Sequence, residues 1–440
     1  MPTVLVGMDI TGDIWLPGHS EYDTQRRAIN PALDPRPSAV VEACGIADVQ
    51  AVVRWARDED LRLAVQSTGH GTHVAARGGL LLKTSRLATV LVDPERRVAR
   101  VGAGATWGQV LAAAAPLGLA PLSGSSPTVG VAGYTLGGGV GWLSRLHGFA
   151  ADSLVRAALV AADGSLVVAD REHETELFWA LRGGGGNFGV VTGLELKLFP
   201  VSHVYAGTSY FDFERAPELL ARYGEWIAEA PDELSTAVLL MQMPSTPDVP
   251  QRVRGRRVLA IRAMYAGNAA DAERALTPLR AAAGPALVEG FSTVGFADAR
   301  MGGTPPRRLE LLNGLPDALI EPLVSAVAEE RVSTIELRHW AGAMAHGDGP
   351  VGHRGAPLSL IADVDDATLS DELAPWATGG SFLNFLSDTS RTATAYTSEN
   401  YARLREVKAE WDPDNLFSFG HNIRPAAGAS RSERPAVPVA

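Results

Sequence analysis

Two histidines three positions apart are the residues of this chain whose types and spacing first suggest chemistry. His70 and His73 form an H-x-x-H pair, and His70 stands within a glycine-containing turn at residues 67–71. A metal site would need further ligands, and the neighbouring sequence supplies neither thiolates nor a suitable carboxylate, so no metal is expected. A neutral imidazole can also act as a nucleophile. A structural histidine in a turn explains the same residues equally well, and the turn alone leaves this choice open.

Two segments rich in glycine follow, at 133–141 and 182–191. Glycine lets backbone amides approach a ligand closely and adopts positive φ at low cost. Two such segments in one domain indicate a long ligand laid against the main chain. The second segment contains a G-x-G-x-x-G pattern, but the residues after it, 190–198, alternate like a strand. A Rossmann dinucleotide site would open a helix there, so this reading is not favoured.

Short strands and helices position these motifs. Apolar residues recur at helical spacing from Ile46 to Leu61, and the run Leu61–Val65 then alternates as a strand leading into the His70 turn. Further strands are expected at 80–82, 90–92 and 98–101. Thr106 is a suitable N-cap for a helix that ends before Pro116. The first part of the chain is therefore expected to be α+β.

The pattern changes after Pro200. Helical spacing at 216–228 and 269–282 alternates with strand-like runs, which predicts a second domain with an antiparallel sheet backed by helices. The strand-like runs are Ala237–Met241, Val258–Tyr265, Val332–Leu337, Leu358–Asp363 and Phe382–Leu386.

Composition limits the classes of partner. The net charge of −11 argues against nucleic acid or an anionic membrane surface, since both favour clustered Lys and Arg. The one cysteine, Cys44, excludes an intrachain disulfide and is expected to be a small buried side chain. The first nine residues lack the basic start of a secretory signal, and no apolar run reaches the roughly 20 residues that span a bilayer. A cytoplasmic protein is expected.

Four segments, in this order, resemble motifs of the berberine-bridge-enzyme-like branch of the vanillyl-alcohol-oxidase flavoprotein superfamily. They are the turn 67–71, the stretch Gly124–Gly139, the stretch Leu177–Val191, and the stretch Tyr401–Phe417. The resemblance extends from near Pro17 to near Pro425. Each motif is weak alone, but the ordered set is highly specific.

The resemblance implies an α+β, two-domain fold of the PCMH-type FAD-binding class. Residues 17–200 would form the FAD-binding domain, and residues 201–395 a substrate-binding domain with an antiparallel sheet. Residues 396–425 would return to complete the FAD-binding domain. Residues 426–440 lack the apolar side chains that would offset the entropy of ordering, so a disordered tail is expected.

The resemblance also implies that FAD is attached covalently, through a bond between His70 and the flavin 8α-methyl group. Backbone amides of the glycine segments would form a nest for the pyrophosphate. The residues expected to bind the cofactor are Ser67, Thr68, Gly69, His70, Gly71, Ser125, Ser126, Thr128, Gly130, Gly133, Thr135, Gly137, Gly138, Gly189, Val191 and Asn415.

The implied activity is that of a FAD-dependent oxidoreductase. Such an oxidase passes hydride from a small organic substrate to the flavin and is reoxidised by O₂. A secondary metabolite or a sugar-like compound is the implied kind of substrate.

Two positions depart from the family pattern. Many relatives bind the flavin a second time through a cysteine where this chain has Ser126, and serine does not form that thioether, so one linkage is expected. Relatives that oxidise alcohols often carry Tyr-x-Asn-Tyr, whose last tyrosine is the base. This chain has Phe385 there, which cannot accept a proton.

The catalytic base is therefore unassigned from the sequence. The candidates for a catalytic role are Tyr134, Asn384 and His339, with Arg338 and His421 as further choices; Asn384 can orient a substrate but is no base. Two other functions stay open. One is flavin-dependent oxygenation or cyclisation without a tyrosine base, and the other is a non-redox protein that keeps FAD as a structural group.

Overall fold

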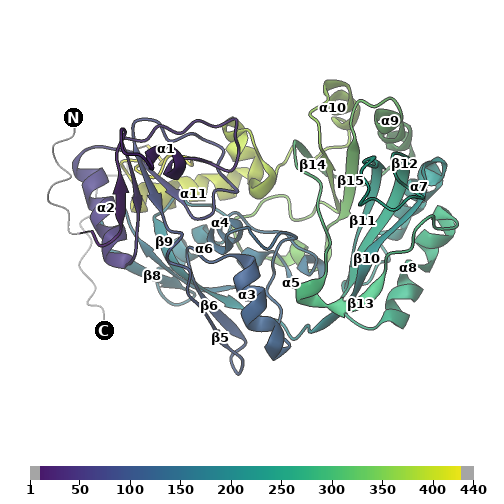
Figure 1. The fold of residues 1–440 in the computed structure, drawn as a ribbon, viewed down its shortest axis with the longest axis horizontal. Helices are drawn as coiled ribbons and strands as arrows, with labels where there is room; N and C mark the ends of the chain where they lie inside the picture. The colour runs from purple at the N-terminus through teal and green to yellow at the C-terminus, as the bar shows by residue number, and fades with distance from the viewer. Residues whose placement is uncertain (1–9, 428–440) are drawn as a thin grey trace.

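Three β-sheets form the framework of the computed structural model, which describes residues 10–427 (Figure 1). Two smaller sheets lie in the first domain, and a seven-stranded sheet forms the second domain. The predicted two-domain α+β fold is confirmed. The predicted tail at 426–440 falls almost wholly outside the described residues.

The first sheet leads directly into the His70 turn. Its strand order is β1-β2-β4-β3, with β2, β4 and β3 parallel. Helix α2 packs its apolar face, Val49, Val52 and Val53, into the core beside this sheet. The elements of this part are β1 (Asp13–Trp15), α1 (Tyr22–Gln25), β2 (Ala39–Glu42), α2 (Ile46–Asp58), β3 (Leu63–Gln66) and β4 (Leu80–Lys83).

The second sheet is antiparallel, in the order β5-β6-β9-β7-β8. Its strand β9 follows the second glycine segment, as the alternating pattern predicts. Thr106 caps α3 through a reciprocal capping box with Gln109. The elements are β5 (Val90–Asp93), β6 (Val98–Gly102), α3 (Trp107–Ala114), α4 (Val131–Leu136), α5 (Ser144–His147), β7 (Leu154–Val160), β8 (Leu166–Asp170), α6 (Thr175–Leu181) and β9 (Val190–Lys197).

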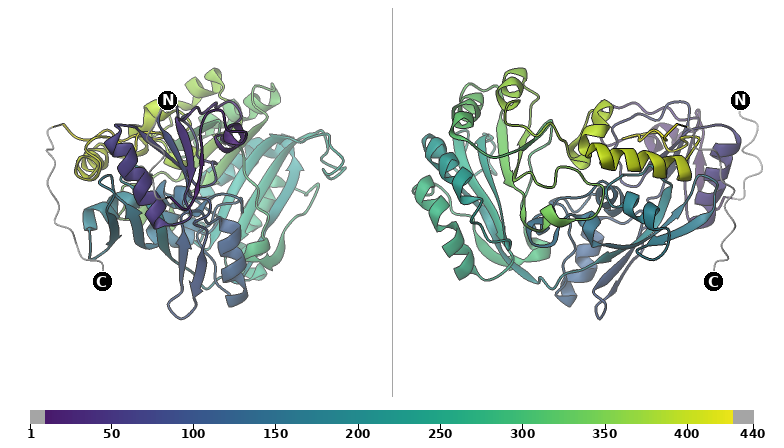
Figure 2. Two further views of the ribbon diagram at one scale, coloured as in Figure 1. Left: turned by 60° about the vertical axis from the view of Figure 1, so that its left-hand side comes forward. Right: turned by 180° about the vertical axis from the view of Figure 1, so that it is seen from behind.

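The seven-stranded sheet is antiparallel, in the order β13-β10-β12-β11-β15-β16-β14. Helices α7 to α10 cover its outer face, and its inner face looks toward the first domain (Figures 1 and 2). The elements are β10 (His203–Asp212), α7 (Ala216–Trp226), β11 (Leu234–Gln242), β12 (Arg257–Tyr265), α8 (Ala269–Ala283), β13 (Ser292–Gly295), β14 (Arg308–Leu312), α9 (Asp317–Ala328), β15 (Thr334–His339), β16 (Leu358–Ala362) and α10 (Ala367–Leu373).

Apolar packing and ion pairs join the two domains. Ala237, Leu239 and Met264 on the inner face of the sheet share one apolar cluster with Leu122 and Trp142 of the first domain.

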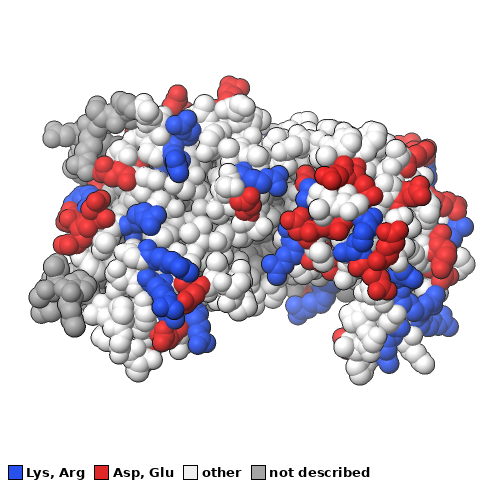
Figure 3. Space-filling view, turned by 90° about the horizontal axis from the view of Figure 1, so that it is seen from above, with Lys and Arg blue, Asp and Glu red and all other residues white. Residues whose placement is uncertain are grey.

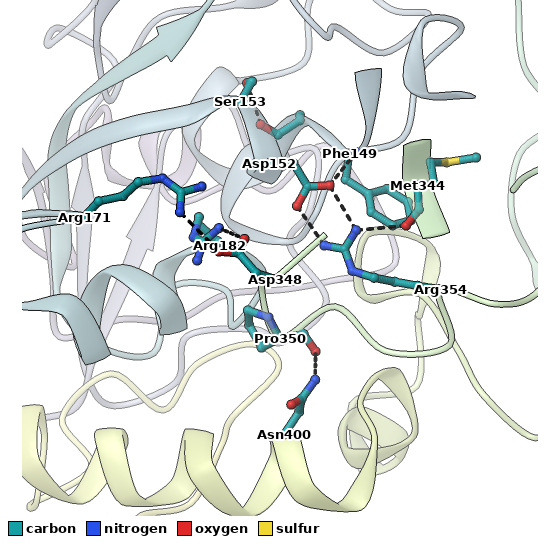
Figure 4. A network of polar contacts seen from close by, with 11 residues as sticks. Phe149, Asp152, Ser153, Arg171, Arg182, Met344, Asp348, Pro350, Arg354 and Asn400 are labelled. Carbon is teal, nitrogen blue, oxygen red and sulfur yellow. Dashed lines mark hydrogen bonds and ion pairs between the residues drawn. The ribbon is translucent and has the colours of Figure 1, made fainter. Parts of the chain in front are cut away.

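Polar contacts tie the loop 344–354 to the first domain (Figure 4). Arg354 pairs with Asp152 at 2.8 Å, and Asp348 pairs with Arg182. Asn400 donates to the carbonyl oxygen of Pro350 at 3.1 Å. These contacts fix one domain against the other.

Two local expectations are wrong. Residues 382–386 do not form a strand; Leu383–Phe385 is a 3₁₀ turn, in which the amide of Phe385 donates to the carbonyl of Phe382. This turn lies beside α4 rather than in the sheet, because the Asn384 side chain bonds to the first domain. Cys44 is exposed, with Nη1 of Arg86 3.0 Å from its sulfur, because the chain turns there from β2 toward α2.

Helix α11 (Ser398–Trp411) returns the chain to the first domain, where it packs against α6 (Figure 2). Its residue Lys408 pairs with Asp412 at 2.6 Å, and both side chains are fully buried. The Lys408 ammonium also donates to the carbonyl oxygens of Asn187, at 2.8 Å, and Phe417, at 3.1 Å. The pair thereby joins α11, the second glycine segment and the C-terminal segment.

The face of the molecule that is seen from above in Figure 3 carries charges of both signs. Side chains of both signs lie interspersed, most densely over the half that carries the seven-stranded sheet (Figure 3). Among residues 10–427, no helix is both long and apolar enough to reach across a bilayer.

Replacing Lys408 by Met should lower the free energy of unfolding by about 3–5 kcal/mol, because it leaves the Asp412 carboxylate buried without its cation. Urea unfolding followed by tryptophan fluorescence measures the loss. Arg403→Met is the control on the same helix. It removes an exposed pair with Glu176 and a contact with the ring of Trp179, 3.9 Å from the centroid, and should cost about 1–2 kcal/mol. Equal losses in the two variants would contradict the structural role of Lys408.

Candidate functional site

A cavity of about 500 Å³ lies between the two domains. Four segments of the first domain line it: the turn after β3, the loop and helix at 124–137, the second glycine segment, and the C-terminal segment at 417–421. The second domain contributes Gly303, Thr304, Arg338, Ile361 and the 3₁₀ turn. The structure thus brings together all four motifs that the sequence singles out.

His70 faces the loop that follows α3 and contains Thr128. Its Nε2 lies 3.2 Å from Oγ1 of Thr128, and its Nδ1 lies 3.2 Å from Oγ1 of Thr68. Partial burial lowers the pKa of the His70 imidazole below its usual value, so the ring is neutral at pH 7. The two hydroxyl groups orient the ring, and a neutral imidazole carries a lone pair on one of its nitrogens.

Ser126 lies on the same side of the cavity as His70. The hydroxyl of Ser126 is 3.0 Å from the Thr128 hydroxyl, which in turn contacts His70. The position that holds a cysteine in many relatives is thus close to His70, but the residue here is serine.

The turn at 67–71 offers backbone donors. The amides of Thr68, Gly69, His70 and Gly71 donate no hydrogen bond to any of the described residues. Oγ of Ser67 is buried without a partner there as well. Backbone amides that are free and lie together in one turn form a nest that an anionic ligand can fill. This set of donors fits the pyrophosphate of FAD.

The 3₁₀ turn is clamped to α4. Oδ1 of Asn384 accepts from the amide of Gly139 at 2.8 Å, and Nδ2 donates to the carbonyl of Tyr134 at 3.1 Å. A Cβ on Gly137 would lie 2.6 Å from Nδ2 of Asn384, so only glycine allows this approach. Asn384 lines the cavity, and its amide positions the turn that carries Phe385.

The other candidate bases at the cavity differ in whether they have a proton-accepting atom at neutral pH. Burial raises the pKa of Tyr134 well above its usual value, and its hydroxyl has no partner among the described residues. Burial lowers the pKa of His421 to about 4; its Nε2 donates to the carbonyl of Leu386, and its Nδ1 faces the hydroxyl of Thr392. The Thr392 hydroxyl donates its one proton to the carbonyl of Thr389 at 2.7 Å, so Nδ1 of the neutral His421 keeps its lone pair.

His339 lies outside the cavity lining. Its Nε2 accepts from Nη1 of Arg145 at 2.7 Å, and burial lowers its pKa to about 3. This histidine belongs to a buried network behind the sheet. The structure does not place it at the site.

Most of the expected cofactor residues line the cavity. Those that do are Ser67, Thr68, Gly69, His70, Gly71, Ser125, Ser126, Gly130, Gly133, Gly137, Gly189 and Val191. Thr128, Thr135, Gly138 and Asn415 do not, although Thr128 contacts His70. Thr135 and Asn415 each have a buried oxygen without a partner among residues 10–427.

Several lining residues were not expected from the sequence. Gly185 and Gly186 stand inside the second glycine segment, so their residue type could have indicated a place in the cavity lining. Thr304 and Ile361 come from the second domain, and nothing in their local sequence distinguishes them. His73 lines the cavity beside His421, with the ring centroids 5.1 Å apart. Within the described part of the chain, no group of three or more His, Cys, Asp or Glu side chains could hold a metal ion.

Two family models match the chain. Residues 37–170 match the model described as FAD binding domain, and residues 381–424 match the model described as berberine and berberine like. The two matches cover the His70 turn and the C-terminal segment, which meet at the cavity.

Known proteins match over nearly the whole chain. (R)-6-hydroxynicotine oxidase of Paenarthrobacter nicotinovorans is 28% identical, over 95% of this chain and 98% of that protein. Xylooligosaccharide oxidase of Thermothelomyces thermophilus is 26% identical, over 92% of this chain and 91% of that protein. The crystal structure of 6-hydroxy-D-nicotine oxidase from Arthrobacter nicotinovorans superimposes with a TM-score of 0.82 at 25% identity, over 96% of this chain and all of that one.

Asn384→Ala should lower the free energy of unfolding by about 1–3 kcal/mol, because it leaves the Gly139 amide and the Tyr134 carbonyl without partners. Ser387→Ala, at an exposed serine just beyond the same turn, is the control and should change little. Urea unfolding measures both variants. If Asn384→Ala were as stable as the control, the clamp would not hold the turn.

Proposed function

Because the chain belongs to the FAD-linked oxidoreductases of the berberine-bridge-enzyme-like branch, we propose that it oxidises a small organic substrate with FAD bound covalently through His70 alone. We assign FAD binding to residues 17–200 with 396–425, and substrate binding to residues 201–395. The observation that carries the proposal is the turn at 67–71, where free amides surround a neutral histidine at the cavity.

Each part of the cavity has a role in this proposal. The amides of the turn hold the pyrophosphate, and the imidazole of His70 supplies the nucleophilic nitrogen for the tether. Thr68 and Thr128 orient that ring. The chemistry that FAD supplies when bound is the acceptance of a hydride from a substrate carbon. O₂ is then the terminal electron acceptor.

The second domain closes the cavity over the substrate. Ile361 and Phe385 place apolar side chains at this end, which exclude water from the reacting atoms. Gly303, Thr304 and Arg338 complete the wall.

A specific observation favours a second candidate function. Phe385 cannot accept a proton, and it stands where relatives that oxidise alcohols often carry the tyrosine base. A reaction that needs no tyrosine base, such as flavin-dependent oxygenation or a cyclisation, suits Phe385 at this position better than tyrosine-assisted alcohol oxidation does. Both functions begin with the same cofactor on the same histidine.

Anaerobic mixing with a library of alcohols, sugars and small aromatic metabolites should identify compounds that bleach the visible absorbance of the oxidised flavin. Readmitted air should restore the band. Release of hydrogen peroxide in step with product would identify the oxidase, and product containing an oxygen atom from O₂ would identify the oxygenase. A protein that no compound bleaches would contradict both functions and favour a structural role for FAD.

Acid-precipitated wild-type protein should keep its yellow chromophore, whereas His70→Ala should release it because the tether is gone. His73→Ala removes the other histidine of the same segment and, as the control, should keep the chromophore. Proteolysis should give one flavin-bearing peptide that contains His70. Free FAD in the wild-type supernatant would refute the tether, and a peptide with flavin on Ser126 would refute the single link.

A further inference from the structure

A buried charge cluster on the inner face of the seven-stranded sheet has a composition that the FAD contacts do not explain. Glu336 and Arg338 lie two residues apart on β15 and therefore point to the same face, where Arg262 of β12 joins them. Oε1 of Glu336 accepts from Nε of Arg338 at 3.0 Å and forms an ion pair with Nη2 of Arg338 at 2.8 Å. Nη1 of Arg262 lies 3.5 Å from Oε2 of Glu336.

The cluster carries one uncompensated positive charge. Burial raises the pKa of Glu336, but Arg338, Arg262 and the hydroxyl of Thr304 together hold it below its usual value, so the carboxylate is ionised. Two guanidinium groups therefore share a single negative charge. The Glu336 side chain is fully buried, and those of the two arginines are about nine-tenths buried, at 9% and 11% exposure.

Arg338 is the member of this cluster that lines the cavity. Its guanidinium lies over the indole of Trp142, 4.6 Å from the ring centroid. The carboxylate of Glu336 contacts Nε and Nη2 of this guanidinium, while Nη1 has no hydrogen-bond partner among the described residues. The guanidinium of Arg338 is thus held by Glu336 along one edge and by Trp142 on one face. Its Nη1 donor is left for a ligand.

A relay of contacts connects Arg338 with the His70 tether of the proposed function. Trp142, on which it stacks, donates from Nε1 to the hydroxyl of Ser125 at 3.1 Å. The next residue, Ser126, reaches His70 through Thr128. No Asp or Glu is among the cavity-lining residues of the described chain, so nothing in the wall repels an anion.

We propose that the substrate is an organic anion and that one of its negatively charged oxygens binds Nη1 of Arg338. The inference rests on the proposed function, because it places the substrate beside FAD in one cavity. A buried cation without a full counter-charge is costly, and an anionic ligand removes that cost through a charge-assisted hydrogen bond. A neutral ligand of the same shape leaves the cation uncompensated and binds more weakly.

The test compares benzoate with benzamide, its neutral isostere, as probes of the purified holoprotein. Both are titrated while the visible absorption of the bound flavin is followed. Wild type should bind benzoate roughly 10- to 100-fold more tightly, as expected for a hydrogen bond to a charged group. Arg338→Gln should abolish the preference. Arg338→Lys should keep part of it, because lysine retains the charge but not the planar fork.

Arg354→Gln is the matched control. Arg354 is another largely buried arginine of the second domain, paired with Asp152 across the domain interface and absent from the cavity lining. Its loss should weaken domain packing while leaving the ratio of benzoate to benzamide affinity unchanged. If Arg338→Gln does not fold, a ratio in Arg338→Lys below that of wild type supports the proposal, and an unchanged ratio overturns it.

Equal affinities in wild type, or a preference that survives in Arg338→Gln, would overturn the proposal. An unchanged ratio with a shifted flavin potential in Arg338→Gln would do so too, since Arg338 would then face the flavin. The flavin absorbance also distinguishes a failure of the proposed function from a failure of this proposal. A colourless protein would contradict the proposed function and this proposal with it, whereas a yellow protein without the preference would contradict this proposal alone.

Discussion

The shape of the cavity depends on the buried pair of Lys408 and Asp412. The ammonium binds carbonyl oxygens of Asn187 and Phe417, and the carboxylate accepts from the amides of Leu416 and Phe417 at 2.7 and 2.9 Å. Two opposite charges without access to water must satisfy each other and the surrounding backbone. The pair therefore fixes the C-terminal segment against the second glycine segment, and both line the cavity.

The second constraint is the fixed contact between the domains. Arg354 with Asp152, and Asn384 with the α4 segment, hold the sheet and the 3₁₀ turn over the first domain. These contacts give the cavity two unlike walls. One wall carries free backbone donors and His70, which suit the phosphates and the tether of FAD. The other carries apolar side chains and the uncompensated charge at Arg338, which suit a substrate.

Local sequence patterns predict the parts of the fold in which the residues of one element make the contacts that fix its conformation. The alternation after Gly189 predicts β9, and Thr106 with Gln109 predicts the start of α3. Patterns fail where the partner is distant. The run 382–386 has the same apolar character in a strand as in a 3₁₀ turn, and its conformation depends on bonds from Asn384 to residues about 250 positions away. The charge of the Arg338 cluster depends likewise on Arg262, from another strand. For His70, the order of four motifs indicates its role, while the turn alone does not.

The intact mass of the purified, denatured protein tests most directly whether His70 is the sole covalent tether of FAD. Denaturation removes every cofactor that is held only by hydrogen bonds and packing, so any added mass is covalent. The wild-type chain should have the mass of its sequence plus one FAD less two hydrogen atoms, which are lost when the bond forms, and His70→Ala should have the mass of its sequence alone. A wild-type mass equal to the bare sequence, or an FAD increment that persists in His70→Ala, would contradict the account.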